Sequence, residues 1–420
     1  MKNNRIIALL ICLMGINTVF SQEIFKFMHY NLLNYPLQDA SKLQYLEVIL
    51  DTYRPDLFTV NELNNLAGAN AILSSLQFIN PNYSSATFVT NSSDDNIGNT
   101  NDLQNFVYFD SSKFILVNQT IIQTLFRDFN HYTFKLNTLN QLANPIFIEV
   151  IVCHLKSSSG TTNQNLRLDM VNDLETYLET LPSTEYMILC GDLNLYTSSE
   201  PAFVELTNVT NNITFVDPAN SVGSWHNNTN YLDVFTQSTR TQTGLGGATG
   251  GFDDRFDFIL TSENMLTNLD IFYVSNSYQV FGNNGNLNCF NSEINTNNCD
   301  GIAFDSTIRN ALFNMSDHLP VTLELQTNET ILSTTNYKLA HGLCILGSNL
   351  VTDELSIQID TNTFKSDFIF IFNTLGQKIE SYKVQNLNLL QLDVSNLSNG
   401  IYYIAASNYD LKPLKFIKSN

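Results

Sequence analysis

The feature that most constrains the fold is a short apolar run, residues 186–190, which ends in Gly191 and is followed at once by Asp192 and Asn194. An apolar run of this length, bounded by glycine, predicts a buried strand. If the chain stays extended, Asp192 and Asn194 point to the same side, at a strand end where rigid sheets often carry polar sites. The alternative is a strand that ends in an Asx-turn, because Asp and Asn also favour turns.

The same pattern recurs along the chain. Strand-like apolar runs end at, or shortly follow, a further set of polar residues: Asn31, Glu62, His154, Asp257, Asp317 and His318. Apolar residues at helical spacing over 43–53 and 166–181 predict helices between some of these strands. Alternation of strands and helices predicts an α/β architecture.

The recurring residues have the chemistry of a hydrolytic site. Carboxylates and amide oxygens suit a hard cation such as Mg²⁺, with Mn²⁺ or Ca²⁺ as alternatives. Two histidines beside carboxylates suit proton transfer at neutral pH. Each residue alone could belong to a turn, but their repeated placement at strand ends favours a common site. His29 and His131 lack such partners and are interpreted as structural.

The charge balance limits the partners of the protein. Asp and Glu number 40 against 20 Lys and Arg, which gives a net charge of -20. Such a chain lacks long-range attraction for nucleic acid or anionic membranes. A phosphate ester substrate would therefore need a bound cation to offset the local repulsion.

The N-terminus and the cysteines indicate export. Lys2 and Arg5 precede an apolar run over 6–20, which predicts a signal peptide over 1–21 and a mature start near Gln22. No later run is long and apolar enough to predict stable membrane insertion. Cys289 and Cys299 are the best disulfide candidates in an exported protein, with two free thiols as the alternative. Two other cysteines lie in apolar runs and are expected in the core: Cys153 and Cys190.

Short motifs between about residues 23 and 326 occur in the order typical of one family. They are Tyr30-Asn31-Leu32-Leu33-Asn34, Asn61-Glu62-Leu63, His154-Leu155-Lys156-Ser157, Gly191-Asp192-Leu193-Asn194, Arg255-Phe256-Asp257-Phe258 and Ser316-Asp317-His318-Leu319-Pro320. Together they resemble the deoxyribonuclease I-like endonuclease/exonuclease/phosphatase superfamily. The resemblance implies a four-layered α/β sandwich, with two packed mixed β-sheets flanked by helices, over residues 22–326.

The same resemblance implies an activity and residue roles. It implies a divalent-metal-dependent phosphodiesterase, most simply a nuclease that hydrolyses DNA or RNA by in-line attack of water. The implied metal residues are Asn31, Glu62 and Asp317. Among the implied catalytic residues, His318 contacts the phosphate and Asp257 orients His318. Asp192 and Asn194 align the attacking water, and His154 is the second histidine. Lys156 and Arg255 adjoin these motifs and are expected to contact substrate phosphates.

The chain changes in character after residue 326. A polar linker over 327–345 is followed by short β-type runs over 346–420, which predict a small β-sandwich. Residues 372–378, 397–402 and 415–418 resemble a type IX secretion sorting domain. That resemblance implies a secretion machinery as partner, and release or attachment at the cell surface. The alternative is an accessory β-domain, for example one that binds carbohydrate.

Other functions remain open at this stage. A sphingomyelinase-like lipid phosphodiesterase would share the fold, and a non-catalytic surface-binding module would keep the fold without the activity. The presence of every expected metal and proton-transfer residue argues against the binding module. Phe258 stands where the inositol phosphatases of the family carry an arginine, which disfavours inositol phosphates. We expect a monomer.

Overall fold

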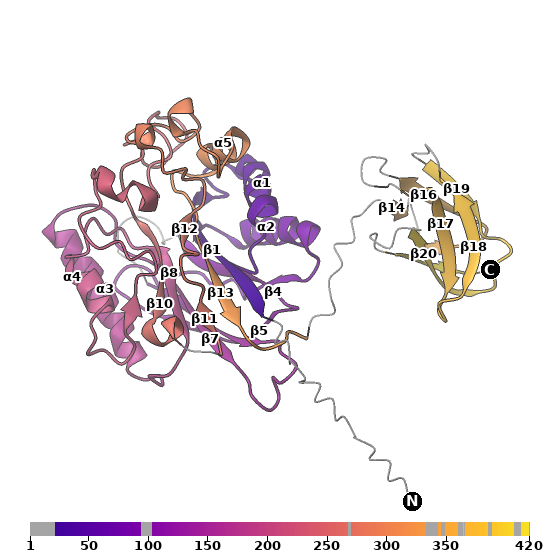
Figure 1. Cartoon of the computed structure of the whole chain (residues 1–420), viewed down its shortest axis with the longest axis horizontal. Coiled ribbons are helices and arrows are strands. Elements are labelled where there is room, and N and C mark those ends of the chain that lie inside the picture. Colours follow the sequence, from indigo (N-terminus) through magenta and orange to yellow (C-terminus); the bar gives the residue numbers. More distant parts are fainter. Residues whose placement is uncertain are drawn as a thin grey trace, which may run out of the picture. The chain divides into compact units, whose positions relative to one another are not determined.

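The computed structural model describes residues 22–93, 103–267, 270–332, 343–345, 349–359, 364, 366–384, 389–406 and 413–419. The chain divides into two compact units, Met1–Leu332 and Ser333–Asn420, and Figure 1 shows the elements of each. The expected signal peptide over 1–21 and most of the expected linker over 327–345 lie outside the described residues.

The first sheet of the larger unit has the strand order β11-β13-β1-β2-β4-β3, with β12 also paired to β13. Its strands are β1 (Glu23–Tyr35), β2 (Leu57–Leu63), β3 (Tyr83–Ser85), β4 (Gln104–Asp110), β11 (Phe272–Tyr273), β12 (Gln279–Val280) and β13 (Val321–Thr327). β1 and β2 run parallel with Asn31 opposite Asn61. The polar ends of these two strands therefore meet at one edge of the sheet.

The second sheet has the order β5-β6-β7-β8-β10-β9. Its strands are β5 (Phe114–Ile122), β6 (Phe129–Leu136), β7 (Phe147–His154), β8 (Met187–Asp192), β9 (Phe215–Val216) and β10 (Asp257–Ser262). β7 and β8 are parallel with His154 opposite Asp192, and β10 is antiparallel with Asp257 opposite Asp192. This register places His154, Asp192 and Asp257 side by side across three strands.

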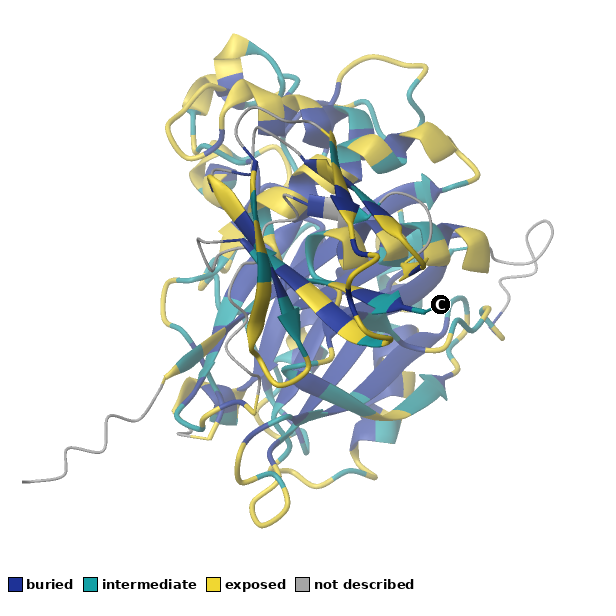
Figure 2. Cartoon of the chain, turned by 90° about the vertical axis from the view of Figure 1, so that its right-hand side faces the viewer, coloured by how far each residue is buried: buried dark blue, intermediate teal, exposed yellow. Residues whose placement is uncertain are grey.

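The two sheets pack face to face and helices cover their outer faces (Figure 1). α1 (Leu43–Tyr53), α2 (Leu66–Ile79) and α5 (Ser306–Met315) pack over the first sheet, and α3 (Thr161–Leu178) and α4 (Pro201–Leu206) over the second. Short 3-10 helices are η1 (Ala40–Lys42), η2 (Thr229–Val234), η3 (Glu263–Leu266), η4 (Leu287–Cys289) and η5 (Asn297–Cys299). The buried strands stand out in dark blue in Figure 2, and the expected four-layered sandwich is confirmed.

Gly191 allows the close approach of β7 and β8. A β-carbon at this position would lie 1.9 Å from the carbonyl oxygen of Cys153, so no other residue fits without moving the backbone. Cys153 and Cys190 are buried core residues, as expected. The disulfide between Cys289 and Cys299 is formed and is also confirmed.

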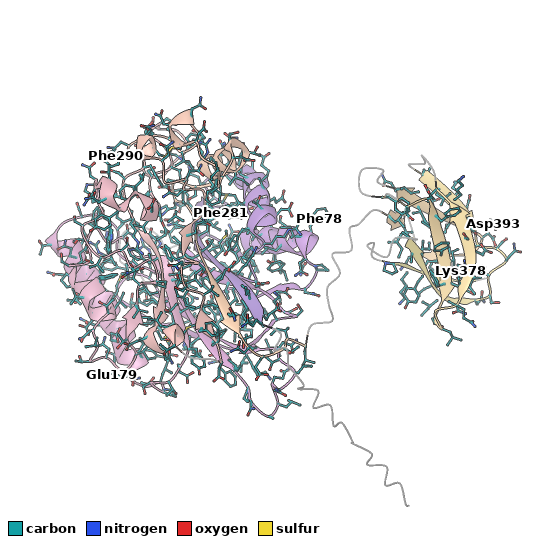
Figure 3. The ribbon with its side chains drawn as sticks, in the orientation of Figure 1. Phe78, Glu179, Phe281, Phe290, Lys378 and Asp393 are labelled. Carbon is teal, nitrogen blue, oxygen red and sulfur yellow. A yellow bond between two sulfur atoms is a disulfide. The ribbon has the colours of Figure 1, made fainter. Side chains whose placement is uncertain are left out.

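The smaller unit is a β-sandwich around its own apolar core. One sheet contains β14 (Leu343–Ile345), β16 (Glu354–Ile359) and β19 (Leu389–Asp393), and the other contains β15 (Leu350–Val351), β21 (Leu414–Lys418), β20 (Gly400–Ala406), β17 (Phe368–Asn373) and β18 (Lys378–Lys383). Figure 3 labels Lys378 at the start of β18 and Asp393 at the end of β19. Among the described residues, no helix combines the length and the apolar character needed to cross a membrane.

Candidate functional site

The polar strand ends of both sheets converge on the carboxylate of Asp192. Asn31, on β1, donates from Nδ2 to Asp192 Oδ2 at 3.1 Å. The same oxygen lies 3.4 Å from His154 Nε2 and 3.7 Å from His318 Nε2. Asn61 ties the sheets together, because its Oδ1 accepts the Asp192 backbone N–H at 2.8 Å. Asp192 is therefore the centre of the site.

Burial raises the pKa of Asp192 to about 7. The nearby His318 lowers this pKa, and the carboxylates of Asp257 and Glu62 raise it further. A carboxylate with a pKa near neutral can take up a proton at neutral pH. The strand end therefore places a potential general base at the centre of the site.

The two histidines beside Asp192 have opposite charge preferences. Burial alone would lower the pKa of His318, but the carboxylates of Asp257, Asp317 and Asp192 outweigh it and raise that pKa well above its usual value. His318 Nδ1 lies 2.7 Å from Asp257 Oδ2. Burial, with Arg127 and His318 nearby, holds the pKa of His154 well below its usual value. These shifts favour the charged form of His318 and the neutral form of His154.

Glu62 enters the site from a strained strand end. Its φ of 59° lies in the left-handed region, which is uncommon for a residue other than glycine. Residues with such strained backbones cluster at functional sites. Its carboxylate accepts Asn31 Nδ2 at 3.1 Å and the Asn34 backbone N–H at 3.0 Å. Burial, reinforced by Asp317, raises the pKa of Glu62. A nearby cation would relieve the cost of keeping this carboxylate charged.

Asp317 is held by a glycine-rich loop, residues 244–251. Its Oδ2 accepts the Ala248 backbone N–H at 2.7 Å and Gln237 Nε2 at 3.1 Å. Its Oδ1 is buried without a hydrogen-bond partner among the described residues. A β-carbon on Gly247 would lie 2.5 Å from this carboxylate. The loop therefore covers one side of Asp317 and leaves one of its oxygens unsatisfied.

The carboxylates form a donor set that fits a divalent cation. Ligand atoms of Glu62, His154 and Asp192 all lie within 4.8 Å of one another. This group shares only Glu62 with the expected metal residues. Asn31 turns its amide nitrogen, a donor, toward the carboxylates, and Asp317 contributes the unsatisfied oxygen. Which of these residues hold the ion stays a prediction.

Asn194 does not continue an extended strand. Its φ is 51°, and its backbone N–H donates to Asp192 Oδ1 at 3.1 Å, so an Asx-turn follows the strand. Its side chain donates from Nδ2 to the carbonyl oxygen of Leu155 at 3.2 Å. Asp192 and Asn194 are thus brought together by the turn and not by strand periodicity.

The expectation that Arg255 contacts substrate phosphates is wrong. Arg255 is fully buried and donates to both carboxylate oxygens of Asp217 at 2.8 Å, with its guanidinium 4.1 Å from the ring centre of Phe258. Lys156 is partly buried and donates to the carbonyl oxygen of Ser157.

Two residues near the site were not found from the sequence. Arg127 donates to the carbonyl oxygens of His154 and Leu155. The amide of Gln237 lies between Asp317 and His318, with its Nε2 2.6 Å from His318 Nε2. Neither residue belongs to a motif, and no local signal in the sequence marks them.

His29 and His131, which the sequence predicts to be structural, have partners other than Asp192. His29 Nδ1 lies 3.0 Å from Thr59 Oγ1, within the first sheet. His131 lies 2.6 Å from Glu149 and 2.8 Å from Tyr177 Oη. These contacts agree with their interpretation as structural residues.

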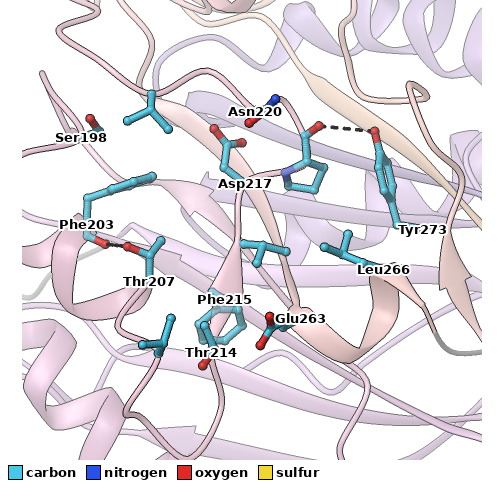
Figure 4. Close-up of a pocket in the computed structure, with 14 residues that line it drawn as sticks. Ser198, Phe203, Thr207, Thr214, Phe215, Asp217, Asn220, Glu263, Leu266 and Tyr273 are labelled. Atoms are coloured by element: carbon cyan, nitrogen blue, oxygen red, sulfur yellow. Dashed lines mark hydrogen bonds between the residues drawn. The ribbon is translucent and has the colours of Figure 1, made fainter.

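A separate pocket of about 570 Å³ lies at the end of β10 opposite Asp257 (Figure 4). None of the expected site residues lines it. The carboxylate of Asp217 on its wall is already paired with Arg255, and Tyr273 Oη donates to the Pro218 carbonyl oxygen at 3.5 Å. The pocket is therefore not part of the polar site.

Several solved structures are similar to this chain at low sequence identity. The human Nocturnin catalytic domain with bound sulfate is 14% identical, covers 73% of this chain and 97% of its own, and has a TM-score of 0.46. An endonuclease/exonuclease/phosphatase family protein from Bacteroides thetaiotaomicron is 13% identical, with 73% and 96% covered and a TM-score of 0.43. TDP2 of D. rerio complexed with a single-strand DNA product is 14% identical, with 73% and 100% covered and a TM-score of 0.44. No curated protein matches.

Family comparisons assign both parts of the chain. Residues 349–418 match the secretion system C-terminal sorting domain. Residues 28–275 match the Endonuclease/Exonuclease/phosphatase family. The second match covers more than half of the 420 residues and includes the site residues from Asn31 to Asp257. The chain belongs to the Endonuclease/Exonuclease/phosphatase family.

Proposed function

We propose that the protein is an exported, divalent-cation-dependent phosphodiesterase that hydrolyses DNA or RNA. One observation carries this proposal. The Asp192 carboxylate accepts a hydrogen bond from Asn31 and lies within 4 Å of both His154 and His318. The pKa values of these two histidines are shifted in opposite directions. Pairs of titratable groups with separated pKa values are typical of acid–base catalysis. Family membership supports phosphoester hydrolysis.

We place the divalent cation at Glu62, whose ligand atom lies within 4.8 Å of those of His154 and Asp192, with the carboxylate of Asp317 nearby. The unsatisfied Asp317 Oδ1 supports this assignment, because a buried carboxylate oxygen needs a partner. Three carboxylates also repel one another unless a cation offsets their charge. When bound, Mg²⁺ or a similar ion would neutralise charge on the phosphate. Mn²⁺ and Ca²⁺ have compatible oxygen-ligand chemistry.

The residues of the chain supply the remaining chemistry. Asp192 accepts the proton of the attacking water, because its pKa of about 7 keeps it partly ionised at neutral pH. The Asx-turn at Asn194 fixes one Asp192 oxygen and Asn31 fixes the other. His318, oriented by Asp257 at 2.7 Å, donates a charged hydrogen bond to the phosphate. His154 Nε2 lies 3.4 Å from Asp192 Oδ2, the oxygen that Asn31 also contacts.

The electrostatics predict weak and salt-sensitive nucleic-acid binding. With a net charge of -20, the protein has no broad basic surface to hold a phosphate backbone. Arg127 and Lys156 are the basic side chains that adjoin the site motifs. Two phosphate contacts would give a slope of about -2 in log affinity against log salt on duplex DNA. Specificity then comes from catalysis and not from tight binding.

A substrate panel tests the proposal. We expect the purified protein to cleave DNA or RNA with Mg²⁺, Mn²⁺ or Ca²⁺, and to lose this activity in excess chelator. His318→Ala should lower turnover by on the order of 10² to 10⁴. Cleavage of sphingomyelin with no cleavage of nucleic acid would transfer the proposal to the lipid phosphodiesterases. No turnover of any phosphodiester would instead favour a binding module.

We also propose that residues 346–420 direct the protein through a secretion machinery after removal of residues 1–21. The match over 349–418 supports this route. Deleting residues 346–420 should leave the protein in the periplasm, because the larger unit contains the site but not the sorting domain. Normal appearance of the truncated protein in the medium would contradict the proposal.

A further inference from the structure

A second group of potential metal ligands lies outside the site described above. His226, Asp253 and Asp254 each offer a ligand atom, and these atoms all lie within 4.8 Å of one another. They come from two segments, because 26 residues lie between His226 and Asp253. The fold brings together one imidazole and two carboxylates, ligand types that transition-metal ions accept.

The backbone holds the two segments against each other. Asn227 N donates to the Asp253 carbonyl oxygen at 2.9 Å, directly beside His226. The backbone N–H of Asp254 donates to the Gln237 carbonyl oxygen at 2.8 Å, and the backbone N–H of Gln237 donates to the Asp254 carbonyl oxygen at 3.0 Å. Trp225, which precedes His226, is fully buried and anchors that segment. The backbones that carry the three side chains are therefore held side by side before any ion binds.

The side chains remain open to an ion. His226 is about half exposed, with a side-chain exposure of 52%, and its Nδ1 lies 2.6 Å from Asp254 Oδ1. The Asp253 carboxylate accepts no hydrogen bond from the residues that the structure describes. One imidazole cannot balance two carboxylates, so the group keeps negative charge toward solvent. A divalent cation would satisfy Asp253 and replace the proton between His226 and Asp254.

We propose that His226, Asp253 and Asp254 form a second cation site, selective for borderline transition-metal ions such as Zn²⁺. Nitrogen ligation favours such ions over Mg²⁺ and Ca²⁺, which prefer oxygen ligands alone. Three protein ligands leave room for water in the remaining position. The group around Glu62 also contains a histidine, His154, so the two sites are told apart by substituting Glu62 and not by ligand chemistry.

The location of this site gives it a positioning role. Gln237, whose backbone is bonded to Asp254, places its side-chain amide against Asp317 and His318. Asp254 also precedes Asp257, the partner of His318, by three residues. A bound ion would tie the His226 segment to the strand that enters the catalytic site. It would act by holding these segments, without contact with substrate.

Zn²⁺ binding to the full-length chain tests the proposal. The parent for the measurement is Glu62→Gln, which weakens the other site, and binding is measured by isothermal titration calorimetry. We expect one high-affinity Zn²⁺ that His226→Gln and Asp253→Asn each weaken at least about tenfold. Asp233→Asn is the matched control, because Asp233 is an exposed carboxylate on η2 outside the group. It should bind Zn²⁺ like its parent.

Two results would overturn the proposal: no Zn²⁺ binding by the Glu62→Gln parent, or equal affinity in His226→Gln, Asp253→Asn and their parent. Circular dichroism and melting in chelator check that each variant folds, and Asp253→Asn keeps the shape of the side chain if His226→Gln misfolds. Because binding is measured directly, the result does not depend on whether the protein hydrolyses a phosphodiester.

Discussion

A single methyl group on Gly247 should disable the site without unfolding the protein. Gly247 has a φ of 73°, and a β-carbon there would lie 2.5 Å from Asp317 Oδ2. Ordinary carbon–oxygen contacts are about 1 Å longer, since atoms pack well only near 3.5 Å. Asp317 cannot move away freely, because Ala248 and Gln237 hold its Oδ2. Gly247→Ala must therefore displace either the loop or the carboxylate.

The size of the effect follows from that displacement. A misplacement of about 1 Å at a catalytic site costs on the order of 10²-fold in rate. The left-handed backbone adds about 1–2 kcal/mol of strain, which lowers Tm by a few degrees in a domain of this size. We expect Gly247→Ala to lose about 99% of its phosphodiesterase activity while its circular dichroism spectrum stays unchanged.

Gly244→Ala is the matched control within the same loop. Gly244 also has a positive φ, 105°, but a β-carbon there would meet nothing within 4 Å. This variant carries the backbone strain without the contact to Asp317, so it should keep most of the activity. Equal activity in the two variants, whether high or low, would refute the claim that the position of Asp317 controls catalysis.

Three further predictions concern other contacts. Asp257→Asn should lower turnover about 10²- to 10⁴-fold, because His318 loses its charged partner at 2.7 Å; steady-state kinetics measure this. Gly191→Ala should destabilise the fold by at least about 2 kcal/mol in urea unfolding, because its β-carbon would overlap the Cys153 carbonyl. Burial raises the pKa of Glu175 from its ordinary 4.5 to about 8, so the folded state favours the protonated form. The stability of the fold therefore falls as the pH rises from 4.5 to about 8. Glu175→Gln should therefore raise Tm by roughly 2–4 °C at pH 8 and not at pH 4, whereas Asp169→Asn, exposed on the same helix, should change neither.

The sequence predicts those parts of the site that depend on local pattern. His154, Asp192 and Asp257 each stand at the end of a buried apolar run, so strand prediction alone brings them to sheet edges. The Cys289–Cys299 bridge was predictable because the two residues flank one short loop in an exported chain.

The remaining parts depend on contacts between distant segments. Gln237 meets His318 across 81 residues, and Arg255 meets Asp217 across 38. Arg255 looked like a phosphate ligand because it adjoins a motif, but a buried aspartate compensates its charge.

The most direct test of the proposed function is the rate of phosphodiester hydrolysis by Glu62→Gln with saturating Mg²⁺. Glutamine keeps the size of the side chain but removes the charge that would hold the cation. Glu179→Gln is the control, because Glu179 is exposed at the end of α3 (Figure 3). We expect Glu62→Gln to lose at least about 10²-fold in rate and Glu179→Gln to match the parent. Equal rates in all three proteins, unaffected by chelator, would contradict a cation-dependent mechanism at this site.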